Sequence, residues 1–182
     1  SFSDKTLTTL EFDKICDLLA ACAASTEGIS SVQGLDIPRY MGKWYEIARM
    51  PHSFERNMDD VTADYTLNED NTVRVVNRGK RDGTFSQAEG IAKLKYKDAY
   101  PVAGEFRVSF FHGDYRIIDL APDYSHAVVT SGTMDYLWIL SRTPQLPQER
   151  LSAILEQLRS RGFDIGRLEY PKQETVPCSS AK

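Results

Sequence analysis

Apolar and polar residues alternate along most of residues 42–142, which is the pattern of half-buried β-strands. Within 60–68, for example, Val61, Ala63 and Tyr65 share one face, and polar side chains occupy the other. The alternation predicts eight strands. They are expected at 42–49, 60–68, 73–80, 87–96, 105–110, 114–120, 126–131 and 136–142.

The connections between these predicted strands are short and contain turn-forming pairs such as Asp82-Gly83 and Pro122-Asp123. Short connections are typical of an up-and-down meander, and closing eight such strands leaves no open sheet edge. We therefore predict an all-β fold, an eight-stranded antiparallel up-and-down barrel whose first strand pairs with its last. This pairing would bring Trp44 beside Arg142 at one end, where a guanidinium can lie over an indole.

Residues 6–24 have helical spacing, with apolar side chains at i, i+3, i+4 and i+7 from Ile15 to Cys22. The sequence Leu19-Ala20-Ala21-Cys22 also resembles a bacterial lipobox, in which the cysteine is lipidated. Charged residues such as Asp17 interrupt the apolar region that such a signal needs. We favour an amphipathic helix, and lipidation of Cys22 is left open.

The chain beyond the last predicted strand contains a second helix, at 147–161. Pro147 suits the first helical position and Gly162 the position after the last turn. Its apolar stripe should pack on the outside of the sheet. We therefore divide the chain into an N-terminal helix with a small, polar linker (1–35), the barrel with its C-terminal helix (36–175) and a tail (176–182).

Composition narrows the classes of function. The chain has 182 residues, of which 41% are hydrophobic and 26% charged, and its net charge of −4 gives no general attraction to nucleic acid. It begins at Ser1 rather than Met, which leaves a removed leader or a trimmed chain open. Cys16, Cys22 and Cys178 all lie outside the predicted strands, and an odd number allows at most one internal disulfide.

The predicted barrel is just wide enough to be filled by side chains or to hold one small ligand. Several small residues lie on the faces predicted to point inward: Ala63, Ala88, Gly90 and Ala92. A filled core would need bulk at these positions, so we favour a cavity. Compensation by large neighbours such as Tyr65 and Trp138 is the alternative.

Three motifs occur in the order found in the lipocalin family. Gly42-x-Trp44 resembles the first, Pro122-Asp123-Tyr124 resembles the second with Pro in place of Thr, and Ser141-Arg142 resembles the third. The predicted topology places all of them at the closed end of the barrel, with Gly42, Trp44, Asp123, Tyr124 and Arg142 as the closed-end residues. Longer runs, such as 42–49 and 136–144, resemble the branch of apolipoprotein D and the bacterial outer-membrane lipocalins. The resemblance covers about residues 36–175.

The resemblance implies binding, storage or transport of a small hydrophobic ligand, with fatty acids and lysophospholipids as the expected class. Tyr65, Asn77, Trp138 and Leu140 match pocket positions of apolipoprotein D, and the alternation also places them inward. An inward amide such as Asn77 indicates a polar ligand group or an ordered water. The full predicted ligand-binding set is Ala63, Tyr65, Val75, Asn77, Ala88, Gly90, Phe106, Val108, Tyr115, Trp138 and Leu140.

Strand direction places Arg56, Lys80 and Arg81 at the open end. We hypothesise that these cations meet a lipid carboxylate or phosphate at the mouth; an ordinary solvated rim is the alternative. The resemblance also bears on Cys178, which matches a C-terminal cysteine of apolipoprotein D. Its strand partner is absent from Met58-Asp59-Asp60, so Cys178 is left to pair with Cys16 or Cys22 or to stay reduced.

Catalysis has little support in the sequence. No predicted strand contains a cysteine, no Gly-x-Ser-x-Gly motif is present, and His52, His112 and His126 lack close metal-ligand spacing. We predict a non-enzymatic carrier without cofactor, metal or nucleic-acid partner. A lipocalin-fold enzyme and an interaction module using the 6–24 helix are the alternatives. Either a monomer or a homodimer is expected, and membrane association is left open. The expected location is extracytoplasmic: periplasmic, outer-membrane-associated or secreted.

Overall fold

The computed structural model describes residues 24–109 and 113–174. The helix predicted at 6–24, apart from its last residue, lies outside this part of the chain, as do the three cysteines and the predicted tail at 176–182. Their predicted roles remain predictions.

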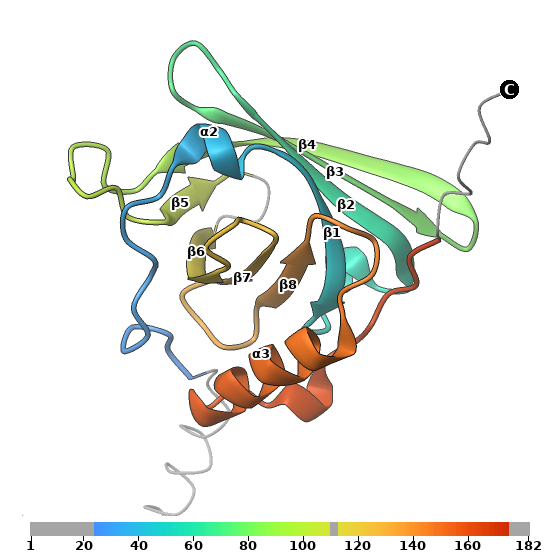
Figure 1. The fold of residues 1–182 in the computed structure, drawn as a ribbon. Helices are drawn as coiled ribbons and strands as arrows, with labels where there is room; N and C mark the ends of the chain where they lie inside the picture. The colour runs from blue at the N-terminus through green and yellow to red at the C-terminus, as the bar shows by residue number, and fades with distance from the viewer. Residues whose placement is uncertain (1–23, 110–112, 175–182) are drawn as a thin grey trace, which may run out of the picture.

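The described chain forms a closed barrel of eight antiparallel strands in sequence order, and the predicted fold class is confirmed (Figure 1). The last strand pairs with the first, as predicted. The strands are β1 (Gly42–Arg49), β2 (Met58–Leu67), β3 (Val73–Arg81), β4 (Thr84–Leu94), β5 (Glu105–Val108), β6 (Gly113–Leu120), β7 (His126–Thr130) and β8 (Leu137–Ser141).

A β-bulge interrupts the closing ladder between β1 and β8. The register shifts between Glu46 and Ala48, so the strict alternation expected for β1 does not hold along its whole length. Glu46 lines the interior, whereas Ala48 belongs to the apolar cluster on the outer side of the sheet. Arg49 follows and reaches back to Glu46. The bulge therefore brings two charged side chains of β1 together.

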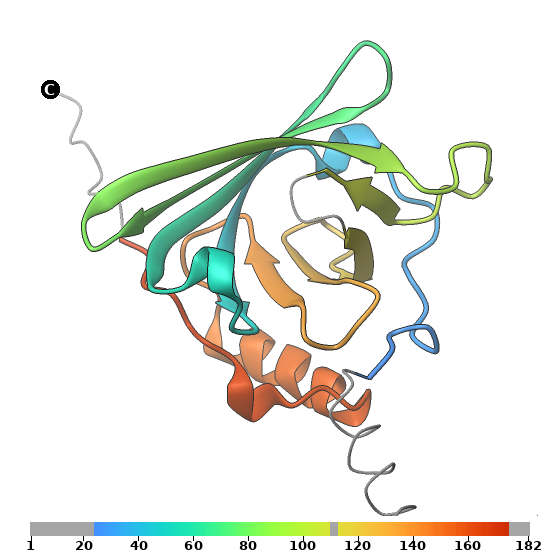
Figure 2. The same cartoon turned by 180° about the vertical axis from the view of Figure 1, so that it is seen from behind.

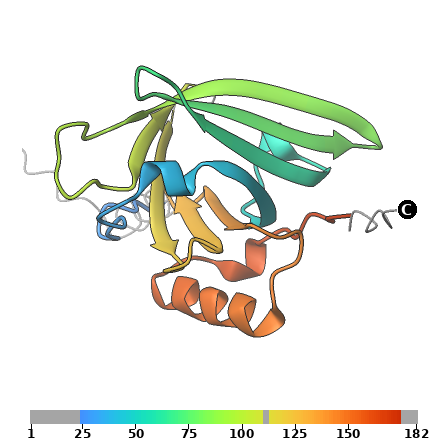
Figure 3. The same ribbon diagram turned by 45° about the horizontal axis from the view of Figure 1, so that its top comes forward.

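Apolar packing divides into two clusters. One fills part of the barrel interior around Trp44, and the other lies between the barrel wall and α3 (Gln148–Ser160). Ile154 and Leu158 of α3 are buried in the second cluster, so the helix packs on the outside of the sheet as predicted (Figure 3). Pro147 is the N-cap of α3 and thus stands one position before the predicted one.

The segment expected to be a polar linker instead packs along the barrel. Thr26 is fully buried, and Arg116 of β6 donates from Nη1 to its carbonyl and hydroxyl oxygens at 2.6 and 2.8 Å. Further along, Val32 N donates to Ile117 O, and Gly104 N donates to Val32 O. Backbone pairing with the barrel explains why a run of small, polar residues is ordered here.

A short helix that the sequence pattern did not predict, α2 (Ile37–Tyr40), lies at the closed end of the barrel (Figure 1). Asp36 caps it by accepting a hydrogen bond from Arg39 N. One helical turn is too short to produce a helical repeat in the sequence. At the opposite end, the β1–β2 connection contains a 3₁₀ turn, η1 (Ser53–Glu55), visible from behind in Figure 2.

The hairpin of β3 and β4 extends past the other strands (Figures 2 and 3). β4 pairs with β3 from Thr84 to Ala92, but its ladder to β5 covers only Ala92 to Leu94. A second 3₁₀ turn, η2 (Ile165–Arg167), follows α3. Within the described ranges, no helix has the length and apolarity needed to cross a bilayer.

Candidate ligand-binding site

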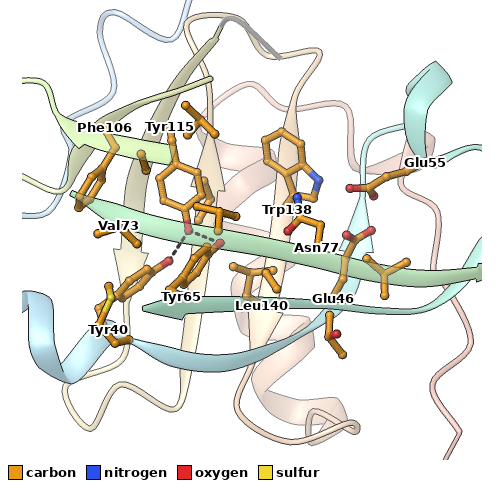
Figure 4. A pocket seen from close by; sticks show the side chains of 18 of the residues that line it. Tyr40, Glu46, Glu55, Tyr65, Val73, Asn77, Phe106, Tyr115, Trp138 and Leu140 are labelled. Carbon is orange, nitrogen blue, oxygen red and sulfur yellow. Dashed lines mark hydrogen bonds between the residues drawn. The ribbon is translucent and has the colours of Figure 1, made fainter. Parts of the chain in front are cut away.

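A cavity lies inside the barrel and is walled mainly by apolar side chains (Figure 4). Its empty volume is about 720 Å³, including the part open to solvent, yet the centre of a water molecule fits in only about 60 Å³ of it. The cavity is therefore narrow compared with its total volume. Its lining residues are Tyr40, Met41, Glu46, Phe54, Glu55, Val61, Thr62, Ala63, Tyr65, Val73, Val75, Asn77, Ala92, Phe106, Val108, Tyr115, Val129, Trp138 and Leu140.

Most of the predicted ligand-binding residues lie together on this cavity wall. They are Ala63, Tyr65, Val75, Asn77, Phe106, Val108, Tyr115, Trp138 and Leu140. The structure does not place Ala88 and Gly90 there: Ala88 is exposed and Gly90 half-buried. Both belong to the part of β4 that extends past its ladder with β5. There, a side chain on the inward face of the strand is no longer enclosed by the barrel. Their small size therefore does not indicate cavity space.

The closed end is built around a fully buried indole. Trp44 Nε1 donates to Tyr40 O at 2.9 Å, and the guanidinium carbon of Arg142 lies 3.8 Å from the centre of the Trp44 ring. The predicted contact between Trp44 and Arg142 is thus present. Gly42 has a φ of +94°, and a Cβ there would lie 3.4 Å from Arg142 Nη1, which explains a glycine at this position.

The remaining closed-end residues lie at the same end. Asp123 accepts a hydrogen bond from Ser125 N, which fixes the turn after β6. The Tyr124 hydroxyl accepts from Asp36 N at 3.0 Å, and the Arg39 guanidinium lies 4.4 Å from the Tyr124 ring centre. These contacts attach the α2 segment to the β6–β7 turn and close this end of the barrel.

Three phenols meet at the deep end of the cavity (Figure 4). The Tyr115 hydroxyl lies 2.6 Å from that of Tyr40 and 2.9 Å from that of Tyr65. Burial raises the pKa of all three phenols, so they stay protonated at neutral pH. Tyr115 is therefore the hub of a neutral hydrogen-bond network facing the cavity.

Two carboxyl groups face the cavity toward its mouth (Figure 4). Glu46 comes from β1 and Glu55 from η1, and we call them the acid pair. Burial, followed by the neighbouring Glu55 carboxyl, raises the pKa of Glu46, and burial raises that of Glu55. Arg49 Nη1 donates to Glu46 Oε1 at 3.0 Å. The acid pair was not predicted from the sequence, although Glu46 stands two residues after Trp44 and thus on the same strand face.

His52 lies beside the acid pair, in the connection that leads into η1. Its ring centre is 3.8 Å from that of Phe54 and 5.5 Å from that of Trp138. Burial and the nearby Arg49 charge lower the pKa of His52 to about 4. The imidazole is therefore neutral at physiological pH.

The predicted mouth cations are partly engaged in local contacts. Arg81 Nε donates to Arg56 O at 2.9 Å, which joins the β3 end to the β1–β2 connection. Lys80 Nζ lies 3.4 Å from both Asp60 Oδ2 and Glu174 Oε2. Arg56 is exposed and lines a shallow depression together with Arg81. The structure thus brings the two arginines together and gives Lys80 its own acidic partners.

Among residues 24–109 and 113–174, no group of three or more His, Cys, Asp or Glu side chains is placed so that it could hold a metal ion.

The Lipocalin-like domain family matches residues 35–173. The chain belongs to the lipocalin family. This lipocalin is 39% identical over 163 residues to outer membrane lipoprotein Blc of Escherichia coli strain K12, covering 86% of this chain and 90% of that protein. It is 35% identical over 158 residues to apolipoprotein D of Rattus norvegicus, covering 80% of each chain. The resemblance to the branch of these two proteins is confirmed.

A solved structure with the same fold is insecticyanin from the tobacco hornworm Manduca sexta. Its TM-score to this lipocalin is 0.68, with 18% identity over 86% of this chain and 90% of that one. At such low identity the likeness shows the fold alone. Lipocalins bind small hydrophobic ligands and are binding or transport proteins rather than enzymes.

Proposed function

We propose that this lipocalin binds, stores or transports a single-chain lipid, a fatty acid or a lysophospholipid, with the acyl chain inside the barrel. The observation that carries this proposal is the narrow, apolar cavity. A slender chain can occupy a narrow space that excludes bulkier molecules. Each methylene buried there contributes about 0.8 kcal/mol.

The proposed chain-binding residues are the predicted ones that line the cavity. Apolar contacts come from both sides of the barrel, for example from Val75 of β3 and Leu140 of β8. Asn77 adds an amide to a mainly apolar wall and can bond a ligand oxygen or a water. The proposed set is Ala63, Tyr65, Val75, Asn77, Phe106, Val108, Tyr115, Trp138 and Leu140.

The rim of the cavity supports a role for positive charge. Arg56 and Arg81 lie together at the open end, and guanidinium groups suit phosphate and carboxylate oxygens. We propose that they meet an anionic lipid group outside the cavity. Lys80 is a weaker candidate, because Asp60 and Glu174 already neutralise it.

An extracytoplasmic location is part of the proposal. It is supported by the similarity to a protein named as an outer membrane lipoprotein. Lipid attachment at Cys22 stays a prediction, which intact mass measurement of the protein from its native host would test. Whether the protein is a monomer or a homodimer is a separate prediction, to be measured as mass in solution.

A displacement titration with a fluorescent fatty acid tests the proposed cavity. Ala63→Phe should lower affinity by about tenfold or more, because the ring would fill space that the chain occupies. Ala153→Phe makes the same change at an exposed position of α3 and should leave binding unchanged. Native mass spectrometry of the purified wild type should also show co-purified lipid. Absence of saturable binding in the wild type, or equal affinity in both variants, would contradict the proposal.

A further inference from the structure

We propose that the acid pair, Glu46 and Glu55, selects the head group of the bound amphiphile. It favours a head that donates hydrogen bonds, a hydroxyl or an ammonium, over a carboxylate attached directly to the chain, so a fatty acid still binds through its acyl chain but less tightly than an alcohol or amine of the same length. This inference rests on the proposed function, because it assumes that a single-chain amphiphile occupies the cavity.

The acid pair belongs to the cavity wall rather than to the outer surface. Glu46 is 4% exposed and Glu55 8% exposed, and both line the same cavity as the chain-binding residues. Arg49 is not among the lining residues and lies behind them. A ligand that reaches this part of the wall therefore meets carboxyl oxygens before it meets the guanidinium.

The hydrogen bonds of Arg49 do not satisfy both carboxyls. Nη1 bonds Glu46, Nη2 bonds Met58 O at 3.1 Å, and Nε lies 3.6 Å from Glu55 Oε2, beyond hydrogen-bond distance. The Glu55 carboxyl does share side-chain hydrogen bonds with Glu46 and Trp138, but within the described residues its buried Oε2 atom has no hydrogen-bond partner. A buried acceptor without a donor is unfavourable. A ligand hydroxyl or ammonium can supply the missing hydrogen bond, and a carboxylate cannot.

The charges around the acid pair favour the same ligands. Arg49 faces three carboxyl groups, those of Glu46, Glu55 and Glu169, the last at 3.4 Å from Nε. His52 adds no positive charge at neutral pH. Once the acid pair ionises, one guanidinium opposes three carboxylates, so a ligand carboxylate would add a further negative charge where an ammonium would restore balance.

Proton linkage gives the inference a second observable. The two carboxyls interact directly, and Glu46 retains a proton well above the pH at which an ordinary glutamate ionises. The phenol of Tyr65 on β2 also interacts with them and stays neutral. An ammonium prefers the ionised pair, so its binding releases a proton. Amine affinity should therefore rise with pH through the raised pKa of the pair, whereas alcohol affinity should change less.

Three probes with the same chain test the inference: dodecylamine, dodecanol and dodecanoate, each displacing a fluorescent fatty acid. We expect wild type to bind the amine and the alcohol more tightly than the carboxylate at neutral pH. Glu55→Gln should weaken amine binding by about tenfold and strengthen carboxylate binding, because it removes the charge and keeps the shape. Glu174→Gln removes an exposed carboxyl near the mouth and should leave the order unchanged.

The outcomes separate the two proposals. If none of the three probes displaces the fluorophore, the proposed function fails and this inference fails with it. If the probes bind but the carboxylate is tightest, or the amine preference survives Glu55→Gln, only the acid-pair inference is overturned. The pH dependence of amine binding is measured on wild type, so it decides even if the variant folds poorly; a flat profile counts against the inference.

Discussion

The guanidinium of Arg142 covers the indole of Trp44 and donates to two backbone carbonyls that precede Trp44 in the chain. Nη1 donates to Lys43 O at 3.0 Å and Nη2 to Arg39 O at 2.9 Å. One side chain from the end of β8 therefore joins β1 and the α2 segment. The contact closes the barrel where its first and last strands meet.

Replacing Arg142 should test how far this contact stabilises the fold. We expect Arg142→Ala to lower the free energy of unfolding by about 2–4 kcal/mol, through loss of the ring contact and two charge-assisted bonds. Arg142→Lys keeps the positive charge but loses the planar guanidinium, so it should lower the free energy of unfolding by less than Arg142→Ala does. Urea unfolding of the three proteins measures the difference. Equal stability of wild type and Arg142→Ala would show that the contact contributes nothing to the fold.

The tyrosine network predicts unequal effects for its three members. Tyr115→Phe removes the hydroxyl that both Tyr40 and Tyr65 bond, so two buried hydroxyls lose their shared partner. We expect this to lower the free energy of unfolding by about 1–3 kcal/mol. Tyr40→Phe removes one bond and leaves the bond between Tyr115 and Tyr65, so it should cost less. Thermal or urea unfolding of both variants measures the order. If Tyr40→Phe proves the more destabilising, the hub assignment is wrong.

His52 should make the protein less stable in mild acid. Its pKa is about 4 in the folded state and 6.5 when unperturbed, so the unfolded chain binds its proton first as pH falls. Neutral His52 contributes fully to the free energy of unfolding above pH 6.5. This contribution, about 1–3 kcal/mol, is lost as the pH falls toward 4. The free energy of unfolding of wild type and His52→Gln should diverge over this range. The raised pKa values of the acid pair make stability rise as the pH falls, but the pair is present in both proteins. If the two plots of unfolding free energy against pH run parallel, His52 is not the cause of the acid destabilisation.

Arg116 should be needed to hold the segment around Thr26 on the barrel. Its Nε lies 2.8 Å from Glu105 Oε1, and its other nitrogens bond the carbonyls of Thr26 and Ile29. Arg116→Met leaves a largely buried carboxylate unpaired, which typically costs about 3–5 kcal/mol. The double variant Arg116→Met with Glu105→Gln should recover part of that loss. Urea unfolding, with hydrogen exchange at Val32, measures both effects; unchanged exchange at Val32 would contradict the role in anchoring.

Strand order and barrel closure could be predicted because the alternation repeats over a long stretch of sequence. Each strand has one face inside and one outside, and short turns leave little choice of neighbour. The contact between Trp44 and Arg142 followed from closure alone. Most of the cavity-lining residues, such as Tyr65 and Leu140, followed from the same alternation.

Alternation failed where local geometry or strand length changed its meaning. Ala88 and Gly90 lie on the strand face that alternation predicts to point inward. At these residues, however, β4 extends past its ladder with β5, so that face does not line the cavity. The β1 bulge brought Arg49 back to Glu46, which strict alternation does not predict. The ordering of the segment near Thr26 depends on bonds to Arg116, a residue distant in the sequence.

The sequence by itself determined the architecture, the family and the residues that close one end, because periodicity and short motifs are properties of neighbouring residues. Only the tertiary structure decided which inward side chains enclose space and which charges meet. Glu55 reaches Glu46 because a loop folds over the barrel mouth, and the pKa values of both depend on the burial that results. Burial and electrostatics depend on distances between segments that the chain separates, and no local pattern contains those distances.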